Sequence, residues 1–254
     1  MKNFYEKLLV NRFEKQEVFA RDDLFKFYAE YDPELKEGTF GWRIYDLKKK
    51  NIIRNVGKGI YSLSGKSVYF PILGKLSKKI AKLLGGNYAD LEYCLWETLC
   101  LNEFSNHQAT TSFIVLEVEK ELLDSVFYFL KKNKMNDLYL QPDEQMIERY
   151  VLERENPVVL KSLITRAPLQ KINDKKLKIT VPYLEKILVD LYCDSKIFYF
   201  YAGKELENIY VNALESYTID FSRLLNYAKR RGKETEVKDF IEENLNYSLG
   251  NILR

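Results

Sequence analysis

The chain has 254 residues, of which 46% are hydrophobic and 30% are charged, and its formal net charge is +3. These values are typical of a folded globular protein, and the length predicts one or two domains. No segment approaches the ~18 consecutive apolar residues of a membrane span, and the N-terminal segment carries charges where a signal peptide requires an apolar core. We therefore expect a cytoplasmic protein with no membrane partner.

Few side chains are suited to nucleophilic or metal chemistry. His107 is the only histidine and lies in a polar stretch, which indicates a loop residue and argues against a Ser-His-Asp triad or a multi-histidine metal centre. Cys94, Cys100 and Cys193 are an odd number without the spacing of metal ligands. We expect them to be buried, reduced thiols, and we expect no metal and no cofactor.

Two helices are predicted first, over residues 3–13 and 22–31. The first places Phe4 and Leu8 among charged residues. The second begins with acids, which are favourable at a helix N-terminus, and continues with aromatic and aliphatic residues such as Leu24.

Residues 39–63 predict a third helix and a β-hairpin. At ~100° per residue the apolar positions of 40–47 fall on one side of a helix, whose start Thr39 is expected to cap. Lysines 48–50 lie in its last turn, where cations are favourable. Two short apolar runs then flank residues 56–59, where two glycines permit a tight reversal. Three helices followed by a hairpin is the order of a winged helix-turn-helix, which we assign to residues 1–70.

Positive charge is concentrated in one part of the chain. Residues 43–82 contain eleven Lys or Arg and one acid, Asp46, which gives +10, whereas residues 1–42 carry −2 and residues 83–254 carry −5. A helix can enter the major groove while a hairpin follows the phosphates, so we predict double-stranded DNA as the partner. The predicted DNA-binding residues are Thr39, Trp42, Arg43, Tyr45, Lys48, Lys49, Lys50, Arg54 and Lys58.

Within this set we assign different roles. We expect Arg43 to read bases, and Lys50 and Lys58 to contact phosphates. Trp42 or Tyr45 is expected to contact a sugar or a thymine methyl. The alternative interpretation is a small α+β module with solvated lysines, in which these two aromatic residues pack against the rest of the protein.

A larger mixed α/β unit is predicted from residue 71 to residue 254. A lysine-rich helix over 73–84 either extends the DNA-facing surface or is simply solvated, and the apolar residues of 90–101 are compatible with strand or helix. The other expected elements of a mixed sheet flanked by helices are a buried strand at 111–118, a helix at 121–132, and strands at 138–140 and 157–164.

The last third is predicted to be helical. One helix starts near Pro182, where the missing amide costs nothing, and the others cover 206–214 and 221–231. The aromatic run 198–201 is expected to end a strand or to form a clamp. We interpret Glu185 and Lys186 as a solvated edge. Candidate functional residues in this region are Lys186, Asp190, Lys229, Arg230 and Arg231.

Three segments resemble the AbiEi family of type IV toxin–antitoxin antitoxins. The sequences IYDL at 44–47 and KNIIRNVGKGIY at 50–61 are similar to the family's helix and glycine-containing wing, and TVPYLEKILVDL at 180–191 is similar to its helix that carries an acid. Residues 85–170 depart from the family. The resemblance implies an α+β fold with an N-terminal winged helix, and a phage-defence repressor that binds inverted repeats in its own operator.

The resemblance further implies a functional partner. Antitoxins of this family counteract a nucleotidyltransferase-like toxin encoded nearby, without forming a stable complex. The same resemblance implies autoregulation of the shared operon.

We expect no enzymatic activity. Glu117, Glu119 and Lys120 follow a predicted strand, as in Mg²⁺-dependent nucleases, but lack the acid-any-lysine spacing, and Asp90 is far away in the sequence. The glycine-rich motifs of nucleotide-binding loops are absent from the sequence. The alternatives are a winged-helix module that docks a protein partner and, less favoured by these residues, a metal-dependent nuclease.

Overall fold

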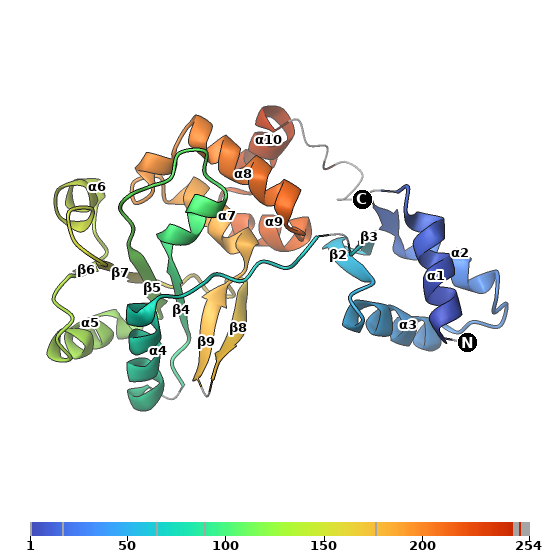
Figure 1. The fold of residues 1–254 in the computed structure, drawn as a ribbon, viewed down its shortest axis with the longest axis horizontal. Helices are drawn as coiled ribbons and strands as arrows, with labels where there is room; N and C mark the ends of the chain where they lie inside the picture. Colours follow the sequence, from blue (N-terminus) through green and yellow to red (C-terminus); the bar gives the residue numbers. More distant parts are fainter. Residues whose placement is uncertain are drawn as a thin grey trace.

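The computed structural model describes residues 2–16, 18–64, 66–88, 90–175, 177–245 and 249. The chain is a mixed α+β structure with a small lobe, residues 2–64, and a larger lobe, residues 66–245 (Figure 1). Among the residues described, none of the helices has both the length and the apolar character needed to cross a membrane.

The small lobe consists of three helices and a three-stranded antiparallel sheet. Its elements are α1 (Lys2–Phe13), β1 (Phe19–Ala20), α2 (Arg21–Ala29), α3 (Glu37–Lys49), β2 (Ile53–Gly57) and β3 (Ile60–Leu63). β3 lies between β1 and β2, and pairs with both. The three predicted helices and the predicted hairpin are therefore present.

The apolar stripe predicted for α3 is buried. It is formed by Phe40, Ile44 and Leu47, which pack with residues of α1 and α2 in the core of the small lobe. The prediction that Thr39 caps this helix is wrong. α3 begins at Glu37 after Lys36, which makes no side-chain capping bond, and Thr39 lies exposed inside the first turn.

A four-stranded sheet forms the centre of the larger lobe. Its strands are β4 (Tyr93–Glu97), β5 (Ile114–Val118), β6 (Leu138–Leu140) and β7 (Val158–Ser162), in the order β4-β5-β7-β6. β5, β7 and β6 are parallel, whereas β4 is antiparallel to β5. The ambiguous residues 90–101 thus contain a strand, which leads into a 3₁₀ helix, Thr98–Glu103.

Helices cover both faces of this sheet. They are α4 (Lys75–Asn87), α5 (Leu123–Lys132), the short α6 (Glu144–Met146), α7 (Leu184–Cys193), α8 (Lys204–Ser216), α9 (Phe221–Arg230) and α10 (Glu234–Asp239). Because side chains alternate along a strand, Leu116 packs in the cluster with α4 and α5, while its neighbour Val115 packs in the cluster with α7, α8 and α9.

Four details of the last third differ from the sequence predictions. A separate antiparallel hairpin, β8 (Leu169–Asp174) and β9 (Leu177–Pro182), was not predicted. Pro182 ends β9, so it does not start α7, which begins at Leu184. The aromatic run forms a 3₁₀ turn, Tyr199–Tyr201, and no strand end. The basic cluster at the end of α9 is followed by another helix, α10.

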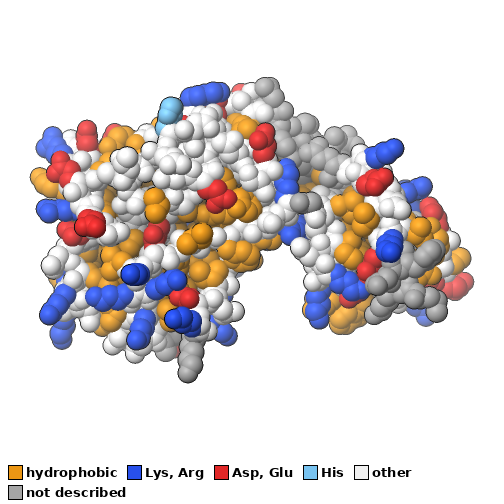
Figure 2. All heavy atoms as spheres, viewed as in Figure 1, with side chains coloured by type: hydrophobic (Ala, Val, Ile, Leu, Met, Phe, Trp, Pro, Cys, Tyr) orange, Lys and Arg blue, Asp and Glu red, His pale blue; other side chains and the backbone are white. Residues whose placement is uncertain are grey.

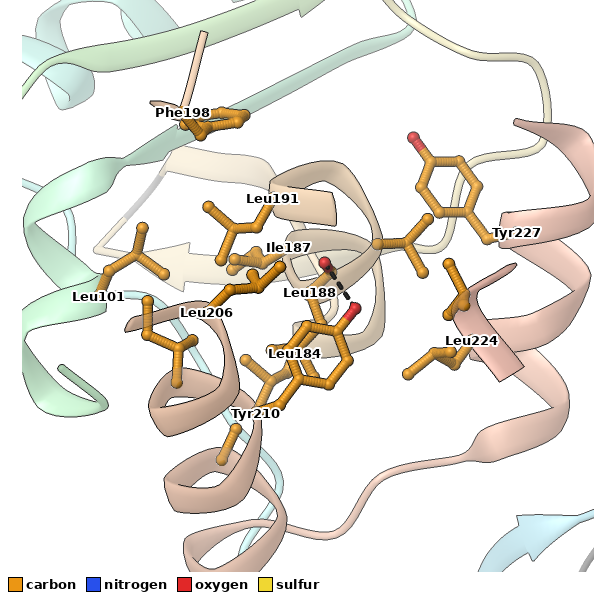
Figure 3. Close-up of a cluster of buried hydrophobic side chains, with 14 of the residues drawn as sticks. Leu101, Leu184, Ile187, Leu188, Leu191, Phe198, Leu206, Tyr210, Leu224 and Tyr227 are labelled. Atoms are coloured by element: carbon orange, nitrogen blue, oxygen red, sulfur yellow. Dashed lines mark hydrogen bonds between the residues drawn. The ribbon is translucent and has the colours of Figure 1, made fainter. Parts of the chain in front are cut away.

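α7 is the central helix of the larger lobe's core (Figure 3). Its apolar stripe lies among side chains from several elements, among them Leu101, Leu206 and Leu224. The hydroxyl of Tyr210 donates a hydrogen bond of 2.8 Å to the carbonyl of Leu188, so the buried phenol is satisfied. This packing fixes the position of the polar residues on α7.

The hairpin β2–β3 packs on the larger lobe. Val56 and Ile60 belong to the hydrophobic cluster of that lobe. The Asn55 amide donates to a carboxylate oxygen of Asp220 at 3.3 Å, and the Arg54 guanidinium donates to the Thr218 hydroxyl at 3.4 Å. The two lobes therefore share both apolar and polar contacts.

Candidate functional site

Two large aromatic side chains stand exposed on the outer face of α3. Trp42 is 72% exposed and Tyr45 is 57% exposed, and their ring centroids lie 5.7 Å apart in an edge-to-face arrangement. Lys49 is exposed one turn further along the helix. These residues project outward because the opposite side of α3 is the buried stripe. The alternative that both rings pack against the rest of the protein is therefore wrong.

Two predicted DNA-binding cations are held by acids within the small lobe. The guanidinium of Arg43 lies 2.6 Å from an Asp32 carboxylate oxygen and 4.9 Å from the centre of the Tyr28 ring. The ammonium of Lys50 pairs with Glu6, and with Asp46 at 2.9 Å. Both side chains thus connect α3 to α1 or α2, and do not belong to its outer face.

Other predicted residues point to different places. Lys58 is exposed in the two-residue turn of the hairpin, next to Gly59, whose φ is +71°. Lys48 and Arg54 line a cavity between the lobes. The structure therefore does not bring the nine predicted residues together on one surface.

This interlobe cavity has a volume of about 810 Å³ and lies in the hollow between the lobes (Figure 2). The small lobe contributes the end of α3 and β2, and the larger lobe contributes β8, the start of α7 and the start of α9. Polar residues from both lobes face it, among them Arg54, Lys171, Glu185 and Arg223. No sequence pattern predicted this cavity, because its walls come from segments far apart in the chain.

The acids of the cavity wall already have partners. Glu185 accepts hydrogen bonds from the Asp220 backbone N–H at 2.8 Å and from Arg223 at 3.3 Å. Asp220 caps α9 by accepting from the Arg223 backbone N–H at 3.1 Å. Burial raises the pKa of Glu185, although the Arg223 charge opposes this effect. Glu185 is 3% exposed, so the prediction of a solvated edge at this position is wrong.

Deep in the larger lobe, six charged side chains form a closed ring of alternating sign. In order, the members of this ion-pair ring are Glu117, Lys186, Asp190, Arg231, Asp194 and Lys161, each of which forms an ion pair with the two beside it. The ring joins β5 and β7 of the sheet to α7 and to the end of α9. Three acids and three bases balance, which is the condition under which buried charges are tolerated.

The geometry of the ring follows from the sheet register. Glu117 of β5 lies opposite Lys161 of β7, and both point toward α7. The Lys186 ammonium lies 2.5 Å from oxygens of Glu117 and of Asp190, one helical turn away. Burial alone would raise the pKa of Asp190, but the charges of Lys186, Lys161 and Arg231 lower it to about 2.

Each charged group of the ring is paired with other members of the ring. Both oxygens of Glu117 face lysine ammoniums, so this carboxylate is not free to hold a metal ion as a nuclease would require. Among the residues described, no cluster of acids, cysteines or histidine has the arrangement of a metal site.

The C-terminal candidate residues fall into two groups. Lys186, Asp190 and Arg231 are brought together in the ring, so the interpretation of Lys186 as a solvated edge is wrong. Lys229 and Arg230 are exposed at the end of α9, and Lys229 lies 3.6 Å from Glu234. Sequence reasoning named Glu117 of β5 only as a candidate residue of a metal-dependent nuclease and missed Lys161 of β7, although a charged position within an apolar strand was an available signal for both.

A second lysine-rich surface lies on the larger lobe. Its lysines come from α4 and from the β8–β9 hairpin, which are joined by a 3.1 Å ion pair between Lys78 and Asp174, the only acid in these elements. The described members of this lysine surface are Lys75, Lys78, Lys79, Lys82, Lys171, Lys175 and Lys178. In Figure 2 basic side chains gather along the lower part of the larger lobe, where Figure 1 places these elements, and α3 lies on the lower side of the small lobe.

Comparison with known proteins places the chain in a family. A search of curated proteins found no match to this chain. A family model described as a family of unknown function, DUF6577, matches residues 39–247. The match starts within α3 and takes in the hairpin, the cavity walls and the ion-pair ring. The chain therefore belongs to the DUF6577 family of unknown function.

Proposed function

We propose that the chain is a DNA-binding transcriptional regulator whose small lobe acts as a winged helix-turn-helix, with α3 as the recognition helix and β2–β3 as the wing. The observation that supports this most directly is the outer face of α3, where Trp42, Tyr45 and Lys49 are exposed together. A recognition helix must present such a face, because a side chain that packs inward cannot reach a base edge.

The roles of Arg43 and Lys50 differ from those expected from the sequence. Tyr45 and Trp42 supply apolar surface for sugars and thymine methyl groups, and Lys49 supplies a phosphate contact. Arg43 and Lys50 position α3 through their acids. The lysine surface of α4 and β8–β9 offers further phosphate contacts on the larger lobe.

The test is a titration of duplex DNA from upstream of the chain's own gene, followed by fluorescence anisotropy at two salt concentrations. Lys49→Ala should weaken binding to all sequences and reduce the salt slope by about one, because one phosphate contact is lost. Trp42→Ala should weaken binding with the slope unchanged. Lys50→Ala, which removes an exposed but internally paired cation, is the matched control and should leave the slope unchanged.

A clear result would contradict the proposal. If no duplex binds more tightly than ~10⁻⁴ M at physiological salt, the regulator function fails, since this is the weak end of non-specific binding. If Lys50→Ala lowers the slope and Lys49→Ala does not, the assignment of the α3 face fails.

The exposed aromatic pair also favours a second candidate, a docking surface for a protein. Trp and Tyr often dominate protein interfaces, because their rings bury a large area with few rotatable bonds. This candidate predicts that Trp42→Ala abolishes capture of the partner, while Lys49→Ala has little effect and no duplex binds.

The antitoxin function implied by the AbiEi resemblance stays a prediction. We propose accordingly that residues 1–70 bind the operator and that residues 71–254 counteract a nucleotidyltransferase-like toxin. Co-expression with the neighbouring open reading frame tests it: growth should be rescued by the full chain, and equally by a Trp42→Ala, Lys49→Ala variant that no longer binds DNA.

A further inference from the structure

The interlobe cavity contains cations that lack anionic partners. Arg54 donates to Asn51 at 2.7 Å, to Ser64 at 3.2 Å and to Thr218 at 3.4 Å, and all three acceptors are neutral. Within the described part of the chain, no carboxylate lies at ion-pair distance from Arg54 or Lys48. Burial lowers the pKa of Arg54, and it also lowers that of Lys48 against the opposing charge of Asp220. These charges are therefore partly desolvated and have no carboxylate at ion-pair distance among the residues described, although the Lys48 ammonium lies 5.0 Å from the centre of the Tyr61 ring.

The cavity wall as a whole carries excess positive charge. Lys171 and Arg223 of the larger lobe face the same space, whereas Glu185 and Asp220 are engaged by backbone N–H groups and by Arg223. Four cations thus face two acids that already accept hydrogen bonds. An anion with several acceptor oxygens would satisfy the unpaired donors, and phosphate is the group that arginine and lysine bind well.

The wall also offers flat apolar surface. Phe70 is 54% exposed and lines the cavity, and no ring or cation packs on it among the residues described. Arg223 already covers the Tyr183 ring at 3.9 Å, which leaves Phe70 as the open stacking surface. Stacking of a planar base on an aromatic side chain is favourable. The volume lies within the range of about 300–1,000 Å³ for small-molecule sites.

We propose that the interlobe cavity binds a small phosphorylated molecule of the mononucleotide class, with its phosphate on Arg54 and Lys48 and its ring on Phe70. This site is separate from the outer face of α3 and does not depend on DNA binding. Because both lobes form its wall, the occupant connects them and stabilises their mutual position.

The probe is adenosine 5′-monophosphate, titrated into the full chain by isothermal calorimetry, with adenosine and inorganic phosphate as its two fragments. AMP should bind, and each fragment should bind at least about tenfold more weakly, because each fragment makes only one of the two contacts. Arg54→Gln and Phe70→Ala should each weaken AMP binding by about tenfold or more.

Matched variants keep the test decisive. Lys48→Gln removes a cation that makes no hydrogen bond or ion pair in the described part of the chain, so it should fold normally and still weaken AMP binding. Lys49→Gln, on the adjacent outer face, should bind AMP like the wild type but lose DNA affinity. Absence of AMP binding at millimolar concentration, or equal binding by the Lys48→Gln and wild-type proteins, would overturn the proposal. Either result leaves the DNA titration unaffected, so the two failures are distinguishable.

Discussion

Lys186 has no exposed surface, yet it lies among residues that keep it charged. Burial by itself lowers the pKa of a lysine, but Asp190 and Glu117 outweigh burial and raise the pKa of Lys186 well above 10.5. An ammonium held in this way is charged at any physiological pH. The ion-pair ring is therefore best described as a structural connection between the sheet, α7 and α9, and its stability depends on each charge having its counterpart.

Removal of one ring member should be costly. Lys186→Met leaves Glu117 and Asp190 short of a partner, and breaking a buried ion pair typically costs about 3–5 kcal/mol. The double variant Glu117→Gln, Lys186→Met restores the charge balance with two acids and two bases, and should recover a large part of that loss. The measurement is the free energy of unfolding in guanidinium chloride.

The control for this series is Lys229→Met. This lysine is exposed and pairs only loosely with Glu234, so the expected change is within about 0.5 kcal/mol. A double variant less stable than Lys186→Met alone would contradict the description of a charge-balanced ring.

At the scale of elements, the hairpin β2–β3 depends on one glycine. Gly59 has a φ of +71°, a conformation that costs other residues about 1–2 kcal/mol, and its carbonyl accepts from the Arg21 N–H at 2.8 Å. A Cβ added at Gly59 would lie 3.9 Å from the Cβ of Arg21, which is an ordinary van der Waals contact. The backbone strain alone therefore determines the change in stability. Gly59→Ala should therefore lower the free energy of unfolding by about 1 kcal/mol.

The matched variant is Gly85→Ala in α4, which should have the opposite effect. Gly85 lies within a helix, and a Cβ there meets nothing within 4 Å. Alanine should raise the free energy of unfolding by about 0.5–1 kcal/mol, because it has the higher helix propensity and restricts the unfolded chain. Thermal unfolding of both variants measures the two effects. Equal shifts of the melting temperature in the same direction for Gly59→Ala and Gly85→Ala would contradict the two predictions.

Elements with a strong local pattern could be predicted from the sequence. The β-branched run of β5 and the apolar stripe of α3 are confirmed, because burial of one face imposes a period that neighbouring residues reveal. β8 was missed since only Leu169 and Ile172 are apolar in it, which leaves no clear alternation.

The candidate sites depended on partners that a sequence does not place. Arg43 and Lys50 carry the charge expected of DNA-binding residues, but they pair with Asp32, in the segment after α2, and with Glu6 of α1. Lys186 looks solvated beside Glu185, because the carboxylate that balances it comes from β5. Charge is a local property of the sequence, whereas pairing is a property of the fold.

For the whole molecule, the contacts between lobes determine how it unfolds. Val56 and Ile60 of the hairpin are buried in the core cluster of the larger lobe, so unfolding of either lobe exposes apolar surface of the other. The hydrogen bonds from Arg54 and Asn55 of the hairpin to Thr218 and Asp220 have the same effect. We expect both lobes to unfold in a single transition.

The two tryptophans allow this to be measured, because there is one in each lobe. Trp96 is fully buried in the larger lobe and Trp42 is exposed on α3, so in a Trp42→Phe variant the fluorescence reports on the larger lobe alone. Helical circular dichroism reports on both lobes. The two urea-unfolding curves should coincide, as they do for a cooperative unit. Val56→Ala, which removes apolar contact at the junction, should move both curves together to lower urea, and a shift of only one curve would mean that the lobes unfold independently.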